Sequence, residues 1–241
     1  MALKDVIFRR RSVRSYENRR LPDTMLAELM DFIGGVKRLE PDIRVEARIL
    51  EKSQVSTTQP WATPHYLAIA SEEKPGWLEN AGFMFQQVDL YLQEKGLGSC
   101  WVGLGKVDEA LVPDGMKHVI LMPFGYPKDV PERSSSHDFR RKNMDEITDC
   151  ADERLEVVRV APSACNSQPW YFVHEDKNTL HMYREGLGLL KRRTLEKWNQ
   201  VDTGIALAHL YLMHGEQFSF RRMEGAPEKK GYIYMGTVKL A

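Results

Sequence analysis

Two segments of the chain, residues 80–95 and 201–214, share one layout, and this repetition constrains the fold more than any other feature of the sequence. Each segment spaces its apolar residues as an amphipathic helix does, and each ends at a glycine. Each also has a glycine near its start, Gly82 in the first and Gly204 in the second. A layout that occurs twice in one chain is typical of internal duplication. We therefore predict two similar halves, each built around one long helix.

A shorter echo agrees with this duplication: Gln59-Pro60-Trp61 recurs as Gln168-Pro169-Trp170, and strand-like residues follow both copies. A tripeptide match also arises by coincidence, so the echo alone does not establish a repeat. The charged, serine-containing residues 128–145 have the composition of a solvated linker. We therefore place the two halves at residues 1–150 and 151–241, the second being the shorter.

The pattern over the whole chain mixes helices with strands. Periodic apolar segments predict helices, and short apolar runs bounded by Gly and Pro predict strands. The predicted helices cover residues 5–11, 22–33, 80–95, 107–111 and 201–214. The predicted strands cover residues 45–50, 65–70, 118–127, 170–173, 180–183 and 232–237, while 154–160 fits either element. This interleaving predicts an α+β fold, a mixed β-sheet flanked by helices.

The charge balance argues against several classes of partner. Lys and Arg together number 34, as do Asp and Glu, so no global field favours nucleic acid or an anionic membrane. No apolar run approaches the length that spans a bilayer, and the N-terminus lacks the apolar core of a signal peptide. We expect a cytoplasmic protein that binds neither nucleic acid nor membrane.

The cysteines and histidines show no metal-binding spacing. Cys100, Cys150 and Cys165 are far apart, which is neither a disulfide framework nor a metal pattern and fits a reduced compartment. Six of the seven histidines do not form a zinc spacing, and we interpret them as structural or surface residues: His65, His118, His174, His181, His209 and His214. We expect no metal site.

Four polar segments remain as candidates for ligand binding: residues 10–14, 96–101, 140–142 and 161–170. Clustered guanidinium groups beside a hydroxyl can hold a phosphate through paired hydrogen bonds. Glycines after a helix either cap it or present backbone N–H groups to a flat ligand. The alternatives are solvated basic faces for the cationic segments, and a polar turn running into a strand for the last segment.

Taken together, these segments resemble the FMN-dependent nitroreductase family. The resemblance is carried by R-R-S-V-R-S-Y from Arg10, G-L-G-S-C-W-V-G from Gly96, F-G-Y-P before an arginine–lysine pair, and A-P-S-A-C-N-S-Q-P-W-Y-F from Ala161. In the usual family order the P-S-x-x-N segment follows the arginine segment closely, whereas here it comes last.

Family members are homodimers that hold each FMN at the subunit interface. The unusual order therefore implies a fused pseudo-dimer in which the second half takes the place of the partner subunit, with one FMN per chain. The Gln-Pro-Trp at residues 59–61 would then be the remnant of a second copy of the binding loop.

The resemblance implies that both halves contribute to the FMN site. Arg10 and Ser12 would hold the phosphate and the ribityl chain, and either Arg141 or Lys142 would add positive charge at the phosphate. Arg14 would lie near the pyrimidine side of the ring. The implied cofactor-binding residues are Arg10, Arg11, Ser12, Arg14, Leu97, Gly98, Ser99, Arg141, Lys142, Pro162, Ser163, Ala164, Asn166 and Gln168.

The resemblance also implies contacts to the flavin ring. The backbone N–H groups of Gly98 and Ser99 would face the flavin atoms N5 and O4. Ser163 and Asn166 would line the flavin from the second half. No catalytic side chain is implied, because the cofactor itself carries out the hydride transfer. Cys165 lies inside the binding loop, where we interpret it as a small packing residue rather than a redox group.

The implied function is that of an FMN-dependent NAD(P)H oxidoreductase, with ping-pong hydride transfer through flavin N5 to a nitroaromatic, quinone or similar flat acceptor. The expected partners are NADH or NADPH and a small-molecule acceptor, and the protein would be a monomeric pseudo-dimer or a homodimer. Within the same fold, the alternatives are different flavin chemistry or a non-catalytic FMN-binding or sensing protein. Outside it, the alternative is an anion-binding module without flavin.

Overall fold

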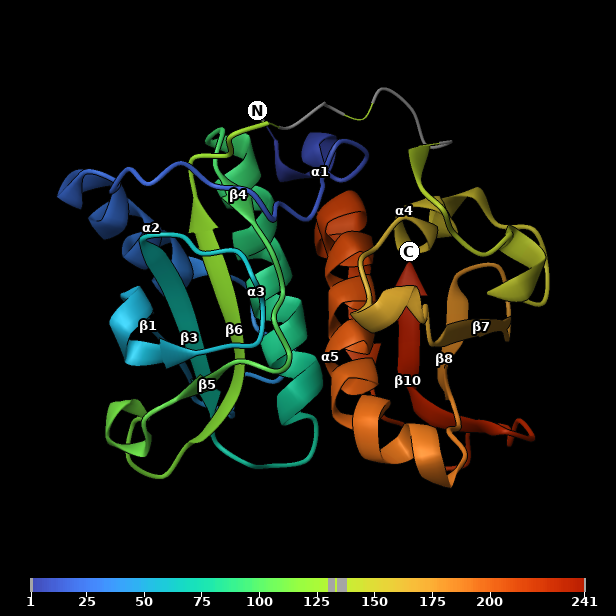
Figure 1. Ribbon diagram of the computed structural model, residues 1–241. Coiled ribbons are helices and arrows are strands. Elements are labelled where there is room, and N and C mark those ends of the chain that lie inside the picture. Colours follow the sequence, from blue (N-terminus) through green and yellow to red (C-terminus); the bar gives the residue numbers. More distant parts are fainter. Residues whose placement is uncertain (1, 130–132, 134–137, 241) are drawn as a thin grey trace.

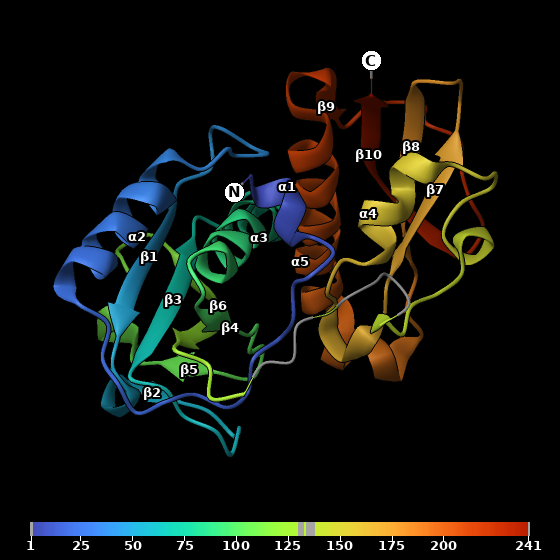
Figure 2. The ribbon, with the colours of Figure 1, turned by 90° about the horizontal axis from the view of Figure 1, so that it is seen from above.

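The structure is a computed structural model that describes residues 2–129, 133 and 138–240. At its centre two long helices, α3 (Trp77–Glu94) and α5 (Leu189–His214), pack side by side, and a four-stranded sheet lies outside each helix (Figure 1). The view from above shows the same layers, with both helices between the two sheets (Figure 2). The predicted α+β class is confirmed.

The two sheets have the same topology. The strand order is β1-β3-β6-β4 in the first sheet and β7-β8-β10-β9 in the second. In both sheets, the first two strands precede the long helix in the sequence. The third strand lies at the sheet edge, and the fourth lies between the second and the third. The strands are β1 (Val45–Leu50), β3 (His65–Ser71), β4 (Gly98–Ser99), β6 (Lys117–Gly125), β7 (Trp170–His174), β8 (Thr179–Glu185), β9 (Phe218–Arg221) and β10 (Tyr232–Leu240).

The pairings between these strands are antiparallel. Isolated parallel bridges, Ser12 with Ser99 and Thr148 with Phe172, add a short parallel segment beside β4 and beside β7. The named strands of each sheet are therefore antiparallel, parallel contacts are limited to these bridges, and the protein has two such sheets rather than the single mixed sheet that was predicted.

Shorter elements connect and cover the two sheets. A short helix precedes the first strand of each sheet: α2 (Asp23–Gly35) before β1, and α4 (Glu156–Arg159) before β7. The remaining short elements are α1 (Leu3–Val6), β2 (Val55–Ser56), β5 (Lys106–Val107) and the 3-10 turns at Lys52–Gln54, Glu109–Leu111, Met144–Glu146, Glu153–Leu155, Ala164–Asn166 and Gly215–Gln217. Because a helix precedes the first strand of both sheets, the similarity of the two halves extends beyond the sheets and the long helices.

Strand alternation explains how the first sheet is covered on both faces. Leu67 and Ile69 of β3 belong to the main core, which also contains residues of α2 and α3. Tyr66 and Ala68 point to the other face and join a smaller cluster with Leu121. Successive side chains of a strand point to opposite faces, so a run of apolar residues at every position requires cover on both sides.

The central helix pair depends on two glycines at matching positions. A Cβ atom on Gly82 would lie 2.0 Å from the carbonyl oxygen of Val201, and one on Gly204 would lie 1.9 Å from that of Glu79. Each glycine thus faces the backbone three residues before the other glycine. Only a residue without a side chain permits so close an approach, and the contact is reciprocal.

Several sequence-based predictions are wrong in detail. Helix α5 begins at Leu189 rather than at residue 201, because Leu189 and Leu190 are 85% and 86% exposed and the first turns therefore lack apolar periodicity. Helix α3 begins at Trp77 rather than at residue 80. The helix predicted over residues 5–11 is limited to α1, and that over 107–111 is replaced by β5 and a 3-10 turn.

The Gln-Pro-Trp echo does not mark equivalent positions. Its first copy precedes β3, whereas its second copy leads into β7, which corresponds to β1. The hypothesis that residues 59–61 are the remnant of a second binding loop is therefore wrong. The segment that corresponds to residues 160–169 by topology lies between α2 and β1, at residues 36–44.

Among the described helices, none is long and apolar enough to cross a membrane.

Candidate functional site

A cavity of about 680 Å³ lies where the N-terminal arginine segment, the segment after β6 and the loop before β7 meet. Six arginines and one aspartate contribute to its lining, so the cavity is strongly cationic. Its volume falls within the range of roughly 300–1,000 Å³ that is typical of small-molecule sites. The lining residues are Arg10, Arg11, Ser12, Arg14, Arg133, Asp138, Arg140, Arg141, Pro162, Ser163, Cys165 and Asn166.

Arg10 is held in place by helix α3. Its side chain is only 2% exposed, and its Nε donates to Oδ2 of the fully buried Asp89 at 2.5 Å. Its Nη2 donates to the hydroxyl oxygen of Ser12 at 3.0 Å. Gln93, one turn after Asp89, accepts a hydrogen bond from the backbone N–H of Arg11 at 2.8 Å. Asp89 thereby orients a guanidinium group at the cavity before any ligand binds.

The glycine-rich segment after α3 supports the arginine segment from behind. A Cβ atom on Gly98 would lie 2.6 Å from the Val13 side chain, and the backbone N–H of Val13 donates to the Ser99 carbonyl at 2.9 Å. The Ser99 hydroxyl is buried and donates to Asp89. Gly98 and Ser99 therefore position residues 10–13, and neither of them lines the cavity.

The loop over residues 162–168 has an unusual backbone. Cys165, Asn166 and Gln168 have positive φ angles of 52°, 56° and 46°. Residues other than glycine rarely adopt this region, and such conformations are typical of functional sites. Two contacts stabilise the loop: the Gln168 N–H donates to the Ser163 hydroxyl oxygen at 2.9 Å, and the Ala164 N–H donates to Oδ2 of the buried Asp202 at 2.9 Å.

Side chains of this loop connect it to the arginine–lysine segment. Arg141 Nη1 donates to Oδ1 of Asn166 at 2.7 Å, and Nδ2 of Asn166 donates to the Arg140 carbonyl at 3.0 Å. The Lys142 backbone N–H donates to Oε1 of Gln168 at 2.7 Å, and Lys142 Nζ donates to the Gln168 carbonyl at 3.1 Å. The two segments form one wall, although they come from opposite sides of the proposed boundary.

The electrostatics of the cavity favour an anionic ligand. Desolvation, together with the charges of Arg10, Arg133 and Arg159, lowers the pKa of Arg141 to about 10. Burial and the charges of Arg10 and Arg11 also lower the pKa of Arg133. Among the described residues, Arg141 Nε and Arg133 Nη1 are buried without a hydrogen-bond partner. Buried donors that lack partners are costly, and a bound anion would satisfy them.

The structure brings eight of the sequence-predicted residues to the cavity lining: Arg10, Arg11, Ser12, Arg14, Arg141, Pro162, Ser163 and Asn166. Six others lie outside the lining within the described chain: Leu97, Gly98, Ser99, Lys142, Ala164 and Gln168. Their hydrogen bonds and packing place several of them directly behind it.

Sequence reasoning missed several members of the site. Arg133, Asp138, Arg140 and Cys165 also line the cavity. Arg140 belongs to the basic cluster that the sequence shows, and a buried acid such as Asp89 within an apolar helix is a signal that was available. Nothing in the sequence around Arg133 separates it from a solvated linker residue.

The fold and this cavity define an α+β protein with a cationic ligand site that is assembled from segments far apart in the sequence. The model of a family described as "Putative TM nitroreductase" matches residues 2–214. The chain therefore belongs to this nitroreductase family.

Several solved structures described as nitroreductases are similar to the chain. A protein of Thermotoga maritima, described as a putative nitroreductase, has a TM-score of 0.67 at 21% identity, covering 100% of this chain and 94% of that one. A nitroreductase family protein of Clostridium difficile has a TM-score of 0.49 at 18% identity, covering 63% and 97%. An FMN-dependent nitroreductase of Clostridium difficile has a TM-score of 0.44 at 15% identity, covering 54% and 93%. The first similarity supports the fold, and no curated protein matches the chain.

Proposed function

We propose that this protein is an FMN-dependent NAD(P)H oxidoreductase that reduces a flat acceptor such as a nitroaromatic or a quinone. Membership of the nitroreductase family supports an oxidoreductase function. The single observation that carries the proposal further is the cavity, because segments 10–14, 138–141 and 162–166 converge on it together with Arg133, so that six arginines line it.

The residues at the cavity fit the phosphate group of FMN. Arginine forms paired, charge-assisted hydrogen bonds to phosphate oxygens. Arg141 and Arg133 both have buried donors without a partner among the described residues, and burial together with the charges of Arg10, Arg133 and Arg159 lowers the pKa of Arg141. We assign the phosphate to Arg10, Arg141 and Ser12. We favour Arg141 over Lys142 because Arg141 lines the cavity and Lys142 does not.

The protein's own residues bind and orient the cofactor. Asp89 presets Arg10, and the Gln168 N–H fixes the Ser163 oxygen while leaving its hydroxyl proton available for donation. Arg14 lies exposed at the cavity, where its charge would favour electron density on the pyrimidine side of the ring. Bound FMN would supply two-electron hydride chemistry, accepting from NADH or NADPH and donating to the acceptor. We nominate no catalytic side chain.

We propose further that residues 1–150 and 151–241 are degenerate halves of a pseudo-dimer with one FMN site. The equal strand orders and the reciprocal glycine contact support this proposal. A monomeric pseudo-dimer or a homodimer, a small-molecule acceptor and a cytoplasmic location stay predictions from the sequence.

The direct test is the absorbance spectrum of the purified protein, taken before and after NADH or NADPH is added without oxygen. We expect flavin bands in the protein as purified, or after incubation with FMN, and bleaching by one of the donors. Flavin bands that persist with both donors would favour a binding or sensing role. Failure to retain FMN after incubation with an excess would refute the cofactor assignment.

A further inference from the structure

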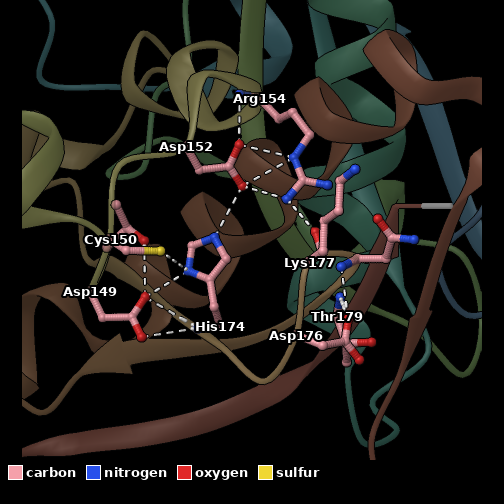
Figure 3. Close-up of polar contacts among 10 residues, drawn as sticks. Asp149, Cys150, Asp152, Arg154, His174, Asp176, Lys177 and Thr179 are labelled. Atoms are coloured by element: carbon pink, nitrogen blue, oxygen red, sulfur yellow. Dashed lines mark hydrogen bonds and ion pairs between the residues drawn. The ribbon is translucent and has the colours of Figure 1, made fainter.

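A second polar cluster lies in the second half, at the point where the chain enters the sheet containing β7. Asp149 and Cys150 follow Thr148, which bridges to Phe172 of β7, and His174 is the last residue of that strand. Figure 3 shows the ring of His174 between Asp149 and Cys150 on one side and Asp152 on the other. None of these residues lines the arginine cavity.

Three electron-rich atoms converge in this cluster. His174 Nδ1 lies 2.6 Å from Oδ1 of Asp149 and 3.1 Å from Sγ of Cys150. The ligand atoms of all three residues lie within 4.8 Å of one another. A nitrogen lone pair, a carboxylate oxygen and a sulfur repel one another unless a positive species lies among them. A proton shared between Nδ1 and Oδ1 can fill this role, and a metal ion would satisfy all three atoms at once.

The other ring nitrogen of His174 is held in the manner of a metal ligand. Nε2 lies 3.1 Å from Oδ2 of Asp152, whose side chain is only 7% exposed. Asp152 is itself fixed by Arg154, whose Nε and Nη2 donate to the two carboxylate oxygens at 2.9 and 2.7 Å. Metal-bound histidines commonly donate their second N–H to a carboxylate, which fixes the tautomer and aims the free lone pair at the ion.

Asp149 is also fixed in place. The backbone N–H of His174 donates to both of its carboxylate oxygens at 3.2 Å. The residue before the cysteine is thus tied to the residue that bears the imidazole, and the three side chains cannot drift apart independently. Such mutual fixing lowers the conformational entropy that metal binding must overcome.

We propose that Asp149, Cys150 and His174 form a zinc-binding site with three protein ligands and one open coordination position. Thiolate, imidazole and carboxylate are the side chains that bind Zn²⁺, at roughly 2.0–2.3 Å. A thiolate and a carboxylate together balance the charge of the ion. As the S–Zn and Nδ1–Zn bonds form, the thiol proton and the proton on Nδ1 both pass to solvent and water ligands leave the ion. The Nδ1–Oδ1 separation then widens from its hydrogen-bond value.

A Cys–His–Asp nucleophile is the competing interpretation, and the geometry does not favour it. The nitrogen that faces the thiol, Nδ1, lies closer to Asp149 than to Cys150. A general base must accept the thiol proton at Nδ1. The hydrogen bond between Nδ1 and Asp149 already occupies that nitrogen. The close approach of these three ligand atoms is what binding of one shared cation requires.

A route from solvent reaches the cluster. His174 lines a cavity of about 260 Å³, which is bounded also by Glu175, His181 and the segment from Met223 to Pro227. Cys150 and Asp149 are themselves exposed. The ion can therefore enter, and the open coordination position is accessible to water.

The test is metal binding by the full chain after EDTA treatment, followed by competition for Zn²⁺ with a chromogenic chelator. We expect one Zn²⁺ per chain with a dissociation constant below about 1 μM, weakened at least 100-fold in Cys150→Ala and in His174→Ala. Asp152→Asn, which alters only the residue behind the histidine, should weaken binding by about 10–100-fold. The matched control, Cys165→Ala, removes an exposed thiol outside the cluster and should leave the Zn²⁺ affinity unchanged.

Substitution with Co²⁺ reads the ligand set independently of affinity. The wild-type protein should show a thiolate-to-cobalt charge-transfer band in the near ultraviolet, retained in Cys165→Ala and absent in Cys150→Ser. Circular dichroism checks that each variant folds. The Co²⁺ spectrum of the wild-type protein tests the proposal even if a variant fails to fold. Substoichiometric Zn²⁺ binding, binding unaffected by Cys150→Ala, or a cobalt spectrum without the thiolate band would overturn the proposal.

Discussion

The two halves share one scaffold but differ in the polar residues that they place on it. Helices α3 and α5 contact each other through Gly82 and Gly204, so residues at equal offsets from these glycines can be compared directly. Seven residues after the glycine, α3 has the buried Asp89 and α5 has Tyr211. The first half therefore has the acid that orients Arg10, and the second half has no acid at that position.

Two other positions show the same topology with different chemistry. Five residues after the glycine, Gln87 donates to the Lys37 carbonyl at 2.9 Å, and His209 donates through Nδ1 to the Val157 carbonyl at 2.7 Å. Lys37 follows α2 and Val157 lies in α4, the helices that precede the first strand of each sheet. Both halves keep a hydrogen bond from this helix position to a backbone carbonyl, but only the side chain of His209 is ionisable.

This comparison teaches that the scaffold and the site obey different constraints. Helix packing needs a glycine on both sides of the contact, so it stays symmetric. The cavity needs one Arg10–Asp89 pair and one positive-φ loop, so each half retains a different part. The proposal of one FMN per chain rests on this asymmetry.

The largest effect is expected from Asp89→Ala, which removes the partner of the buried Arg10. An unpaired buried charge costs about 3–5 kcal/mol, so the free energy of unfolding should fall by that amount. Tyr211→Phe, at the equivalent position of α5, should cost less than about 1 kcal/mol. Urea denaturation monitored by circular dichroism measures both. Equal effects at the two positions would show that Arg10 does not depend on Asp89.

The next effect tests the symmetry of the helix contact. Gly82→Ala and Gly204→Ala should each destabilise the protein by about 1–3 kcal/mol or more, because the added Cβ meets backbone that cannot move aside cheaply. Gly34→Ala is the control, since no atom lies within 4 Å of its added Cβ. In an exposed helix position that change should stabilise by up to about 1 kcal/mol. A large cost at only one of the two central glycines would break the comparison.

The histidine with the largest expected effect on the pH dependence of stability lies in the second half. Burial lowers the pKa of His209 to about 4. The folded state therefore binds fewer protons than the unfolded state between pH 6.5 and 4, so stability is full above pH 6.5 and falls as the pH drops through this window. Between pH 7 and pH 5 the loss should be about 2 kcal/mol.

His209→Gln gives the α5 position the residue that α3 has at Gln87, and it should remove this part of the pH dependence. Urea denaturation of both proteins at pH 7 and pH 5 provides the measurement. An undiminished loss in His209→Gln would assign the effect to another group.

The smallest effect concerns the loop that the second half contributes. Asn166→Ala removes the hydrogen bond to Arg141 and should weaken FMN affinity about tenfold, which corresponds to about 1.4 kcal/mol. Gln59→Ala changes the Gln-Pro-Trp copy that the topology shows to be unrelated, and it should leave FMN affinity unchanged. Flavin fluorescence titration measures both, and an unaffected Asn166→Ala would mean that the second half does not complete the site.

Much of the fold was predictable because it depends on local patterns. Apolar periodicity located α3 and strands β1, β3 and β10, and the glycines at the contact between α3 and α5 were visible as exceptions within helices. The start of α5 was not predictable, because its first turns are exposed and carry no periodic signal. The Gln-Pro-Trp echo gave a wrong prediction because it is a local sequence match, and its two copies precede strands that do not correspond.

Of the candidate site, the sequence determined which segments carry binding chemistry: the arginines near the N-terminus, the arginine–lysine pair and the loop from Pro162. Which of their side chains line the cavity depends on the tertiary structure. Gly98 and Ser99 turned out to support residues 10–13, whereas Arg133 and Cys165 line the cavity. The pairing of Arg10 with Asp89 spans 79 residues, and the approach of Asp149 and Cys150 to His174 spans about 25. Local sequence encodes the burial and backbone preference of each residue, but distances between remote side chains follow from how the helices and sheets pack.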